Sequence, residues 1–523
     1  MPIARTPAAR YDAIVVGAGA AGCVVAARLS EDPAMRVLLV EAGPDGRTDA
    51  AIADAAHWDA LLGGAYDYGY RSAPAEAVLG RSLAMPRGRV LGGSSSTNAM
   101  LWYRGHPGDY DAWAAGGATG WSYADLLPFF RRSESRVGGD PAHRGTDGPM
   151  RVGPLAAVHP IAHALLGAAA ERGLPVLDDA NAGDNEGAVY ADYNAVVGEG
   201  GAFERWSVVR GYLDPALARP NLDVVVGSRV HGLVLDDDAT VGGIRHLVGG
   251  AQVTTRAART ILAAGAIDTP RMLQLSGIGD PARLAAAGVR PRHDLPGVGE
   301  NFQDHPLILG MNFRARGDLG PVIGNGGGTM VNWQSSRARG RADLHAVIAH
   351  GSRGDETLHA AHDLSGERVF AIVPGLYHSR SVGWVRVRSA DPDAAPEIQP
   401  NYLADPADLA AMVDAVDAVQ DLVATPAYAE LAAGPITPAA GLSRSAHERF
   451  VRENVGTFFH CSGTARIGTD ELAVVDPGLR VRGLEGLWIA DASVMPAIPT
   501  SNTQAPTVAI AERAAELVRS AAG

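Results

Sequence analysis

The chain has 523 residues, more than a single hydrophobic core usually serves, so at least two structural units are expected. Hydrophobic residues at 46% and charged residues at 20% are ordinary for a globular enzyme, whereas a formal charge of -13 disfavours nucleic-acid binding. Only two cysteines, Cys23 and Cys461, are present, which excludes a disulfide framework and a cysteine metal cluster. We expect no metal, no membrane span and a cytoplasmic location, since residues 1–10 contain no apolar signal segment and no apolar run reaches about 18 residues.

The first apolar run is followed by a glycine-rich turn and a helical pattern of small residues. In this order Gly17 permits a tight turn, Gly19 lets backbone amides approach a pyrophosphate, and Gly22 lets the helix pack closely on the strand. The helix N-terminus adds partial positive charge. A second apolar run, 37–40, ends in Glu41, whose carboxylate can bind ribose hydroxyls. The pattern predicts a dinucleotide site and leaves open whether the ligand is NAD or FAD.

Further elements follow this opening unit. We predict a loop with a short helix over 45–82, helices over 109–132, a strand pair at 223–226 and 230–235, and a buried strand at 260–264. Apolar and polar residues alternate between 310 and 384, as at 344–348 and 384–388, which is typical of an antiparallel sheet with one face in water. A buried strand at 486–490 and a helix at 507–521 end the chain. A dinucleotide-binding domain interrupted by a largely antiparallel one accounts for this order.

Three later segments carry residues suited to ligand contact. Residues 86–100 form a Gly/Ser-rich loop, which the composition alone allows to be either a flexible linker or a ligand-binding loop. Residues 265–279 follow a buried strand and suit phosphate or ribose contact, or simply a turn with Thr269 as helix cap and Pro270 at the first helical position. His460 follows two phenylalanines that would exclude water and keep its imidazole neutral, although a single histidine is more often structural than catalytic.

Taken in order, these blocks resemble the glucose-methanol-choline (GMC) oxidoreductase family across nearly the whole chain. They are PRGRVLGGSSSTNAMLWYRG from Pro86, GAIDTPRMLQLSGIG from Gly265, PGVGENFQDHP from Pro296, the segment 392–403, and VVDPGLRVRGLEGLWIADASVMPAIPTSNTQAP from Val474. Within the family, the chain is most similar to bacterial aryl-alcohol and hydroxymethylfurfural oxidases and to choline-dehydrogenase-like proteins.

The resemblance implies an α/β fold. A Rossmann-like FAD-binding domain would cover 10–305 and be completed by about 455–520. An interrupting α+β substrate domain built on an antiparallel sheet would cover 306–455, with contributions from about 150–205.

FAD is the cofactor that the resemblance implies. It would be held noncovalently, because Thr97 stands where some relatives bond the flavin through a histidine. The glycines of the first turn would bind the diphosphate, Glu41 the adenosine ribose, and the backbone of Val230 the adenine. The full implied set is Gly17, Gly19, Ala20, Ala21, Gly22, Glu41, Ala42, Arg87, Val90, Gly92, Gly93, Ser95, Asn98, Ala99, Met100, Val230, Ala264, Gly265, Asp491, Ala492, Asn502 and Thr503.

The family's catalytic pair corresponds to His460 and Asn502. Neutral His460 would take the hydroxyl proton of an alcohol while Asn502 binds the same oxygen, and hydride would pass to flavin N5. The resemblance implies oxidation of a primary or secondary alcohol, with primary aryl and furanic alcohols as the leading candidates, to the aldehyde or ketone, with oxygen or a quinone as acceptor. Candidate pocket aromatics are Tyr66, Tyr68, Trp102, Trp333, Tyr377 and Phe459.

Two other classes share the fold: hydroxynitrile lyases, which perform no net redox chemistry, and light-driven photodecarboxylases, which the pair His460 and Asn502 disfavours. Either a monomer or a homodimer is expected.

Overall fold

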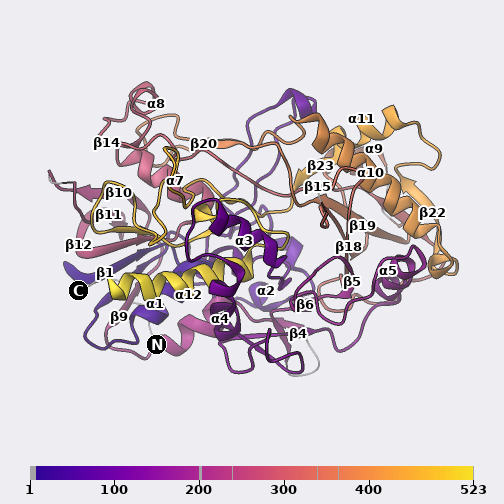
Figure 1. The fold of residues 1–523 in the computed structure, drawn as a ribbon, viewed down its shortest axis with the longest axis horizontal. Helices are drawn as coiled ribbons and strands as arrows, with labels where there is room; N and C mark the ends of the chain where they lie inside the picture. The colour runs from indigo at the N-terminus through magenta and orange to yellow at the C-terminus, as the bar shows by residue number, and fades with distance from the viewer. Residues whose placement is uncertain are drawn as a thin grey trace.

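Two β-sheets organise the chain and lie at opposite ends of the molecule in Figure 1. The computed structural model describes residues 7–198, 203–237, 239–338, 340–362, 364 and 366–521. The first sheet has seven strands in the order β10-β11-β12-β1-β2-β9, with β24 also paired to β12. Its strands are β1 (Arg10–Val16), β2 (Val37–Val40), β9 (Leu222–Val225), β10 (Val230–Leu235), β11 (Val241–Val248), β12 (Ala251–Leu262) and β24 (Leu487–Ile489).

Strands from both ends of the chain form the parallel part of this sheet. β1 pairs in parallel with β2 and β12, and β12 pairs in parallel with β24. Every residue of β2 is buried, as expected for a strand covered on both faces. Helices α1 (Ala20–Leu29) and α12 (Gln504–Ser520) pack against each other beside the sheet (Figure 1). The predicted interruption of the dinucleotide-binding sheet is therefore confirmed, while the boundaries at 10–305, 306–455 and 455–520 stay predictions.

The turn after β1 needs glycine at two positions. Gly17 has φ +93°, which residues with a side chain rarely adopt. A Cβ on Gly22 would lie 1.8 Å from the Gly17 carbonyl oxygen, so any larger residue would push α1 away from the turn. Both residues therefore have the turn and packing roles that the sequence predicts.

The predicted strand pair at 223–226 and 230–235 is wrong in its pairing. β9 pairs in parallel with β2, whereas β10 pairs antiparallel with β11, a strand that the sequence reading missed. The connection does not close a hairpin, because the Gly227 and Ser228 amides donate to the Gly43 and Glu41 carbonyls, both at 2.8 Å. These bonds tie the connection to the end of β2.

Helix α7 (Gly265–Leu275) begins before the predicted cap. Thr269 and Pro270 lie inside it, and the Thr269 hydroxyl donates to Asp491 at 2.6 Å instead of capping the helix. Pro270 has no amide hydrogen for the Ala266 carbonyl, and that carbonyl accepts from the Thr464 hydroxyl at 2.7 Å. A tertiary hydrogen bond thus replaces the missing helical one.

The second sheet is antiparallel, as predicted, and contains eight strands. Five of them follow in the order β22-β16-β19-β18-β17, with β5 at the edge, and β15 joins β19 to β23. They are β5 (Gly187–Tyr190), β15 (Pro306–Ile308), β16 (Asn312–Ala315), β17 (Thr329–Trp333), β18 (Leu344–His350), β19 (Val369–Leu376), β22 (Ala432–Thr437) and β23 (Val455–Thr457). Helices α5 (Pro160–Glu171) and α10 (Pro406–Val423) pack on this sheet, and α11 (Arg444–Asn454) packs on α10.

The alternating segment at 384–388 does not belong to that sheet. β20 (Trp384–Arg386) pairs only with β21 (Glu397–Gln399) among the described residues. Its central amide, that of Val385, donates to the Gly299 carbonyl at 2.7 Å. This bond ties the segment to the chain that leads from the first lobe, built on the first sheet, to the second lobe, built on the second sheet. Alternation predicted the strand correctly but could not select its partner.

The remaining elements are short strands and helices around the two sheets. The strands are β3 (Glu134–Arg136), β4 (Met150–Pro154), β6 (Asp192–Tyr193), β7 (Ala195–Val197), β8 (Phe203–Arg205), β13 (Ile278–Gly279) and β14 (His293–Asp294). The helices are α2 (Ala50–Ala53), α3 (Pro107–Ala115), α4 (Tyr123–Ser133), α6 (Asp214–Ala216), α8 (Pro281–Ala286) and α9 (Glu356–Ala361). None of the helices in the described part of the chain is long and apolar enough to cross a membrane.

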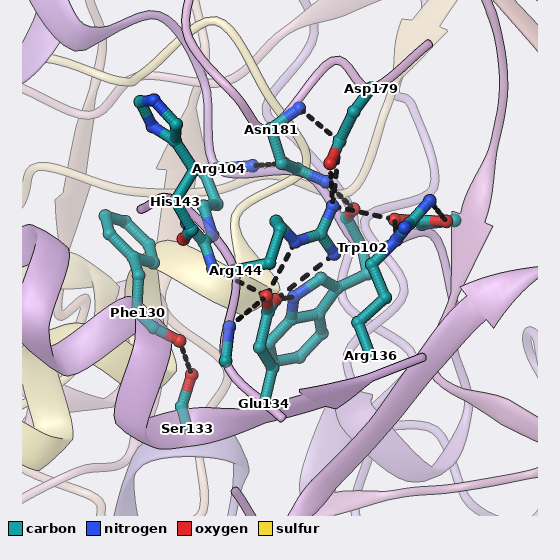
Figure 2. Close-up of polar contacts among 12 residues, drawn as sticks. Trp102, Arg104, Phe130, Ser133, Glu134, Arg136, His143, Arg144, Asp179 and Asn181 are labelled. Carbon is teal, nitrogen blue, oxygen red and sulfur yellow. Dashed lines mark hydrogen bonds and ion pairs between the residues drawn. The ribbon is translucent and has the colours of Figure 1, made fainter. Parts of the chain in front are cut away.

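A buried ionic cluster surrounds Glu134, the first residue of β3 (Figure 2). Glu134, fully buried, forms ion pairs with Arg104 at 2.7 Å and Arg144 at 2.6 Å and accepts the Trp102 indole N–H at 2.9 Å. Arg144 also pairs with Asp179 and Asp192. The two guanidinium groups hold the pKa of Glu134 below its ordinary value although burial by itself would raise it. The buried charges of this cluster therefore compensate one another, so that loss of one leaves its partner buried without an opposite charge.

We expect Glu134→Ala to lower the free energy of unfolding by about 3–5 kcal/mol, because it leaves Arg104 buried without a carboxylate partner. The matched control is Glu453→Ala, which removes a solvent-exposed ion pair with Arg449 and should cost less than about 1 kcal/mol. Urea unfolding of both variants, followed by circular dichroism, measures the difference. Equal midpoints for the two variants would contradict the role assigned to the cluster.

Candidate active site

A cavity of about 580 Å³ is lined by residues of both lobes. Its lining includes most of the positions predicted to hold FAD: Gly17, Gly19, Ala20, Ala21, Glu41, Ala42, Arg87, Gly93, Ser95, Asn98, Ala99, Met100, Val230, Ala264, Gly265, Asp491, Ala492, Asn502 and Thr503. Three predicted positions, Gly22, Val90 and Gly92, are not in the lining. Gly22 and Gly92 pack behind it, and Val90 is buried in a small cluster with Ile52 and Leu61.

At one part of the cavity, the start of α1 faces Glu41. Among the described residues no side chain caps α1, and a Cβ on Gly19 would meet nothing nearer than the Ala263 carbonyl oxygen at 4.0 Å. The Glu41 carboxylate accepts the backbone amides of Ala18 at 2.9 Å and Gly43 at 2.8 Å. Burial raises the pKa of Glu41 to about 7. The free amides at the start of the helix suit a diphosphate, and the buried carboxyl group beside them suits a ribose.

The Gly/Ser-rich loop is buried, so its interpretation as a flexible linker is wrong. Ser95 and Ser96 are 1% and 2% exposed. Asn98 accepts from the buried Arg205 guanidinium at 2.8 Å, and the amide of Asn325 donates to the Ala99 carbonyl at 2.7 Å. These contacts hold the loop along the cavity from two sides.

His460 and Asn502, the predicted catalytic pair, lie beside each other at the cavity. The Asn502 side-chain amide donates to His460 Nε2 at 3.2 Å, and both residues are in the lining. Burial is the main cause that lowers the pKa of His460 well below 6.5, and the neighbouring His345 and Arg87 add to it. His460 is therefore neutral at pH 7, and its Nε2, which accepts the Asn502 amide, is the unprotonated nitrogen that a general base requires.

Backbone strain orients His460. Phe459, directly before it, has φ +66°, a conformation that costs a side-chain-bearing residue of order 1–3 kcal/mol. The surroundings fix this turn, because the Phe459 amide donates to the Thr457 hydroxyl at 2.7 Å and its carbonyl accepts from Arg87 at 2.6 Å. Arg87 thus joins the loop at 86–100 to the segment that carries His460.

Two further residues, Asp304 and His305, contact the segment that carries His460, and the sequence predicted no role for either. Asp304 is buried, and one carboxylate oxygen accepts the His460 amide at 2.7 Å and the His305 amide at 2.9 Å. The other oxygen accepts from Tyr402 at 2.5 Å and from Thr457. His305, fully buried, lies with Nδ1 2.9 Å from His460 Nδ1. Both lie in the block GENFQDHP. A carboxylate and an imidazole directly before Pro306 are the sequence feature from which a role in the site could have been predicted.

Next to His460 the cavity wall is apolar. Leu307, Leu309, Val347, Ala349, Val373 and Phe458 line it and form one packed cluster. The rings of Phe458 and His460 lie 4.5 Å apart. Beside this wall, the His460 imidazole and the Asn502 amide are the polar groups that bond to each other.

Of the predicted pocket aromatics, Phe459 and Tyr68 line the cavity, and Tyr66, Trp102, Trp333 and Tyr377 do not. Trp102 is engaged with Glu134 in the ionic cluster, and Trp333 packs in the core of the second lobe. The Tyr377 hydroxyl donates to Asn332 at 3.2 Å inside the same lobe. Trp58, which was not predicted, is in the lining.

Comparisons with known proteins agree with this arrangement. Two family models described as GMC oxidoreductase match residues 11–307 and 379–511. The chain is 35% identical to the mitochondrial choline dehydrogenase of Homo sapiens, with 97% of this chain and 90% of that protein covered.

The chain belongs to the GMC oxidoreductase family.

Solved structures of similar fold include pyridoxine 4-oxidase from Mesorbium loti, with 32% identity, a TM-score of 0.92, and 98% of this chain and 99% of that chain covered. They also include a formate oxidase of Aspergillus oryzae RIB40 studied for modification of its FAD, with 25% identity, a TM-score of 0.91 and 99% of both chains covered. The predicted family, its fold and an FAD-dependent enzyme that acts on CH–OH donors are thereby confirmed.

The residues of this GMC oxidoreductase fit FAD. The uncapped amides at the start of α1 suit its phosphates, the Glu41 carboxyl its ribose, and the loop at 86–100 supplies small residues where a flat ring system needs close backbone approach. Thr97, which also lines the cavity, offers no imidazole for a covalent bond to the flavin.

Proposed function

We propose that this enzyme holds FAD noncovalently and oxidises a neutral primary alcohol, aryl or furanic in character, to the aldehyde. The observation that carries the proposal is the neutral, buried His460, whose Nε2 is 3.2 Å from the Asn502 amide at an apolar cavity wall. An alcohol whose hydroxyl binds between these two side chains would place its reacting carbon in the cavity.

The chain's own residues would perform the proton part of the reaction. His460 Nε2 takes the hydroxyl proton, so the O–H bond breaks and an N–H bond forms. Asn502 donates to the oxygen and stabilises the negative charge that develops there. The apolar wall excludes water that would compete for the base. FAD, when bound, supplies the acceptor for the hydride that leaves the carbon.

The charges of the cavity favour a neutral substrate over a quaternary ammonium. The carboxylates among its described lining residues are Glu41, Asp59, Asp268 and Asp491. Glu41 and Asp491 accept backbone amides, Asp268 pairs with Arg271, and Asp59 lies 3.6 Å from Arg353. All four are thus already bonded within the protein, so a cationic alcohol would find no free counter-charge among the described residues of the lining.

The direct test is anaerobic reduction of the bound flavin by benzyl alcohol, hydroxymethylfurfural or choline. We expect the neutral alcohols to bleach the flavin and choline to do so far more slowly. In His460→Ala the flavin should stay bound while its reduction slows by at least about 10²- to 10⁴-fold, the usual worth of a general base. His57→Ala, at an exposed position, is the control.

Fast reduction in His460→Ala would overturn the assignment of the base. Turnover of a cyanohydrin with a permanently oxidised flavin would instead indicate a hydroxynitrile lyase. Admitting oxygen after reduction separates an oxidase, which reoxidises at once, from a dehydrogenase that needs a quinone-type acceptor.

The pKa of His460 sets the expected pH dependence. The unprotonated imidazole is the active form, and burial holds its pKa well below 6.5. The rate of flavin reduction should therefore stay level as the pH falls from 8 to about 6.5, and should decline only at lower pH, where His460 binds a proton. Stopped-flow reduction with a non-ionising alcohol measures this profile. A decline that begins above pH 7 would contradict a desolvated base.

Glu41→Gln should weaken FAD binding. Both oxygens of Glu41 accept backbone amides, so the NH₂ group of glutamine would face the Ala18 or Gly43 amide and displace the side chain from the ribose. Loss of one hydrogen bond to the ribose costs about 1–3 kcal/mol, equivalent to a roughly 5- to 150-fold rise in Kd. Titration of the apoprotein with FAD, followed by flavin fluorescence, gives the value. Glu471→Gln, an exposed position, should bind like the wild type.

A further inference from the structure

We propose that His305 is a positioning residue that fixes the tautomer of His460. The inference rests on the proposed role of His460 as base. His305 is fully buried, and its Nδ1 lies 2.9 Å from His460 Nδ1. It does not line the cavity, so it acts on the reaction only through His460.

The hydrogen bonds around His460 determine where its proton lies. The Asn502 amide donates to Nε2, so Nε2 carries no proton. A neutral imidazole then has its proton on Nδ1, which donates to His305 Nδ1. His305 must therefore carry its own proton on Nε2, the ring nitrogen that does not face His460. The three side chains form one chain of donors, from Asn502 through His460 to His305.

Several contacts hold the His305 ring in the orientation that this chain needs. Asp304 binds the backbone amides of both histidines through a single carboxylate oxygen. The Tyr377 ring packs edge-on against His305 with centroids 5.0 Å apart, and His345 packs against it at 6.3 Å. Tyr377, which was predicted to line the substrate pocket, thus contacts the imidazole behind the base. A ring held on these sides cannot turn its Nδ1 away from His460.

The arrangement prepares His460 for proton transfer. Without an acceptor at Nδ1, the imidazole can place its proton on Nε2, where it would block uptake of the hydroxyl proton. With His305 in place, Nε2 stays unprotonated before the reaction. After Nε2 has taken the alcohol proton, the cationic His460 still donates its Nδ1 hydrogen to neutral His305. His305 gains and loses no proton in this step.

The matched pair His305→Asn and His305→Leu separates this role from packing. Asparagine and leucine have the same shape, but only asparagine offers an oxygen at the position of Nδ1. We expect the limiting rate of flavin reduction at saturating alcohol to fall at least 100-fold in His305→Leu, by analogy with the roughly 10⁴-fold loss when a catalytic histidine is left in the wrong tautomer. His305→Asn should stay within about tenfold of the wild type.

Further readouts distinguish positioning from general damage. The dissociation constant of the alcohol and the FAD content should change less than about threefold in both variants, since His305 is not in the cavity lining. His447→Leu, at a buried histidine on α11, should reduce its flavin at the wild-type rate. Equal losses in the leucine and asparagine variants, or no loss in either, would overturn the proposal.

A measurement on the unmutated holoenzyme keeps the proposal testable if His305→Leu does not fold. In ¹⁵N-histidine-labelled protein, nitrogen chemical shifts identify which ring nitrogen bears the proton, and the His460 signals are those lost in His460→Gln. We expect the Nδ1-protonated tautomer, and an Nε2-protonated His460 would refute the inference. If His460→Ala reduces its flavin normally, the proposed function fails instead, whichever tautomer is found.

Discussion

The pairing of β12 with both β1 and β24 is the constraint on which the site depends. Val16 is in register with Leu262, and Leu262 is in register with Ile489, so three strands end at the same level. The carboxyl ends of parallel strands form the edge where dinucleotides bind. Segments from the start, middle and end of the chain therefore reach one cavity. Without β24 in this sheet, the segment that carries Asp491 and Asn502 would have no fixed place beside the first turn.

Desolvation sets the chemistry of this cavity. It raises the pKa of the carboxyl groups of Glu41, Asp304 and Asp491 and lowers that of the imidazoles of His305 and His460. Both shifts favour uncharged side chains, and each carboxyl group is compensated by backbone amides or hydroxyls. A site built in this way keeps a base unprotonated at neutral pH, and the nearby Arg87 guanidinium favours the same neutral state.

The same buried interactions serve stability and positioning. Asp304 joins the segment before β15 to the segment after β23, and the strained Phe459 persists because Arg87 and Thr457 bind its backbone. The ionic cluster around Glu134 holds the chain that follows the Gly/Ser-rich loop. Loss of these contacts would therefore disturb geometry at the cavity as well as the free energy of unfolding.

From the sequence alone came the parallel strands, the turn at Gly17, the family and the pair His460 and Asn502. These features depend on local conformation or on ordered motifs, which the chain carries directly. The sequence also offered Trp102, Trp333 and Tyr377 as candidate pocket residues, but it does not determine which surface each one meets. Only the tertiary structure placed those aromatics outside the cavity lining and brought His305 to His460, 155 positions away in the chain. Periodicity predicts which side chains are buried. Strand pairing and packing between distant segments decide which of these buried groups contact each other.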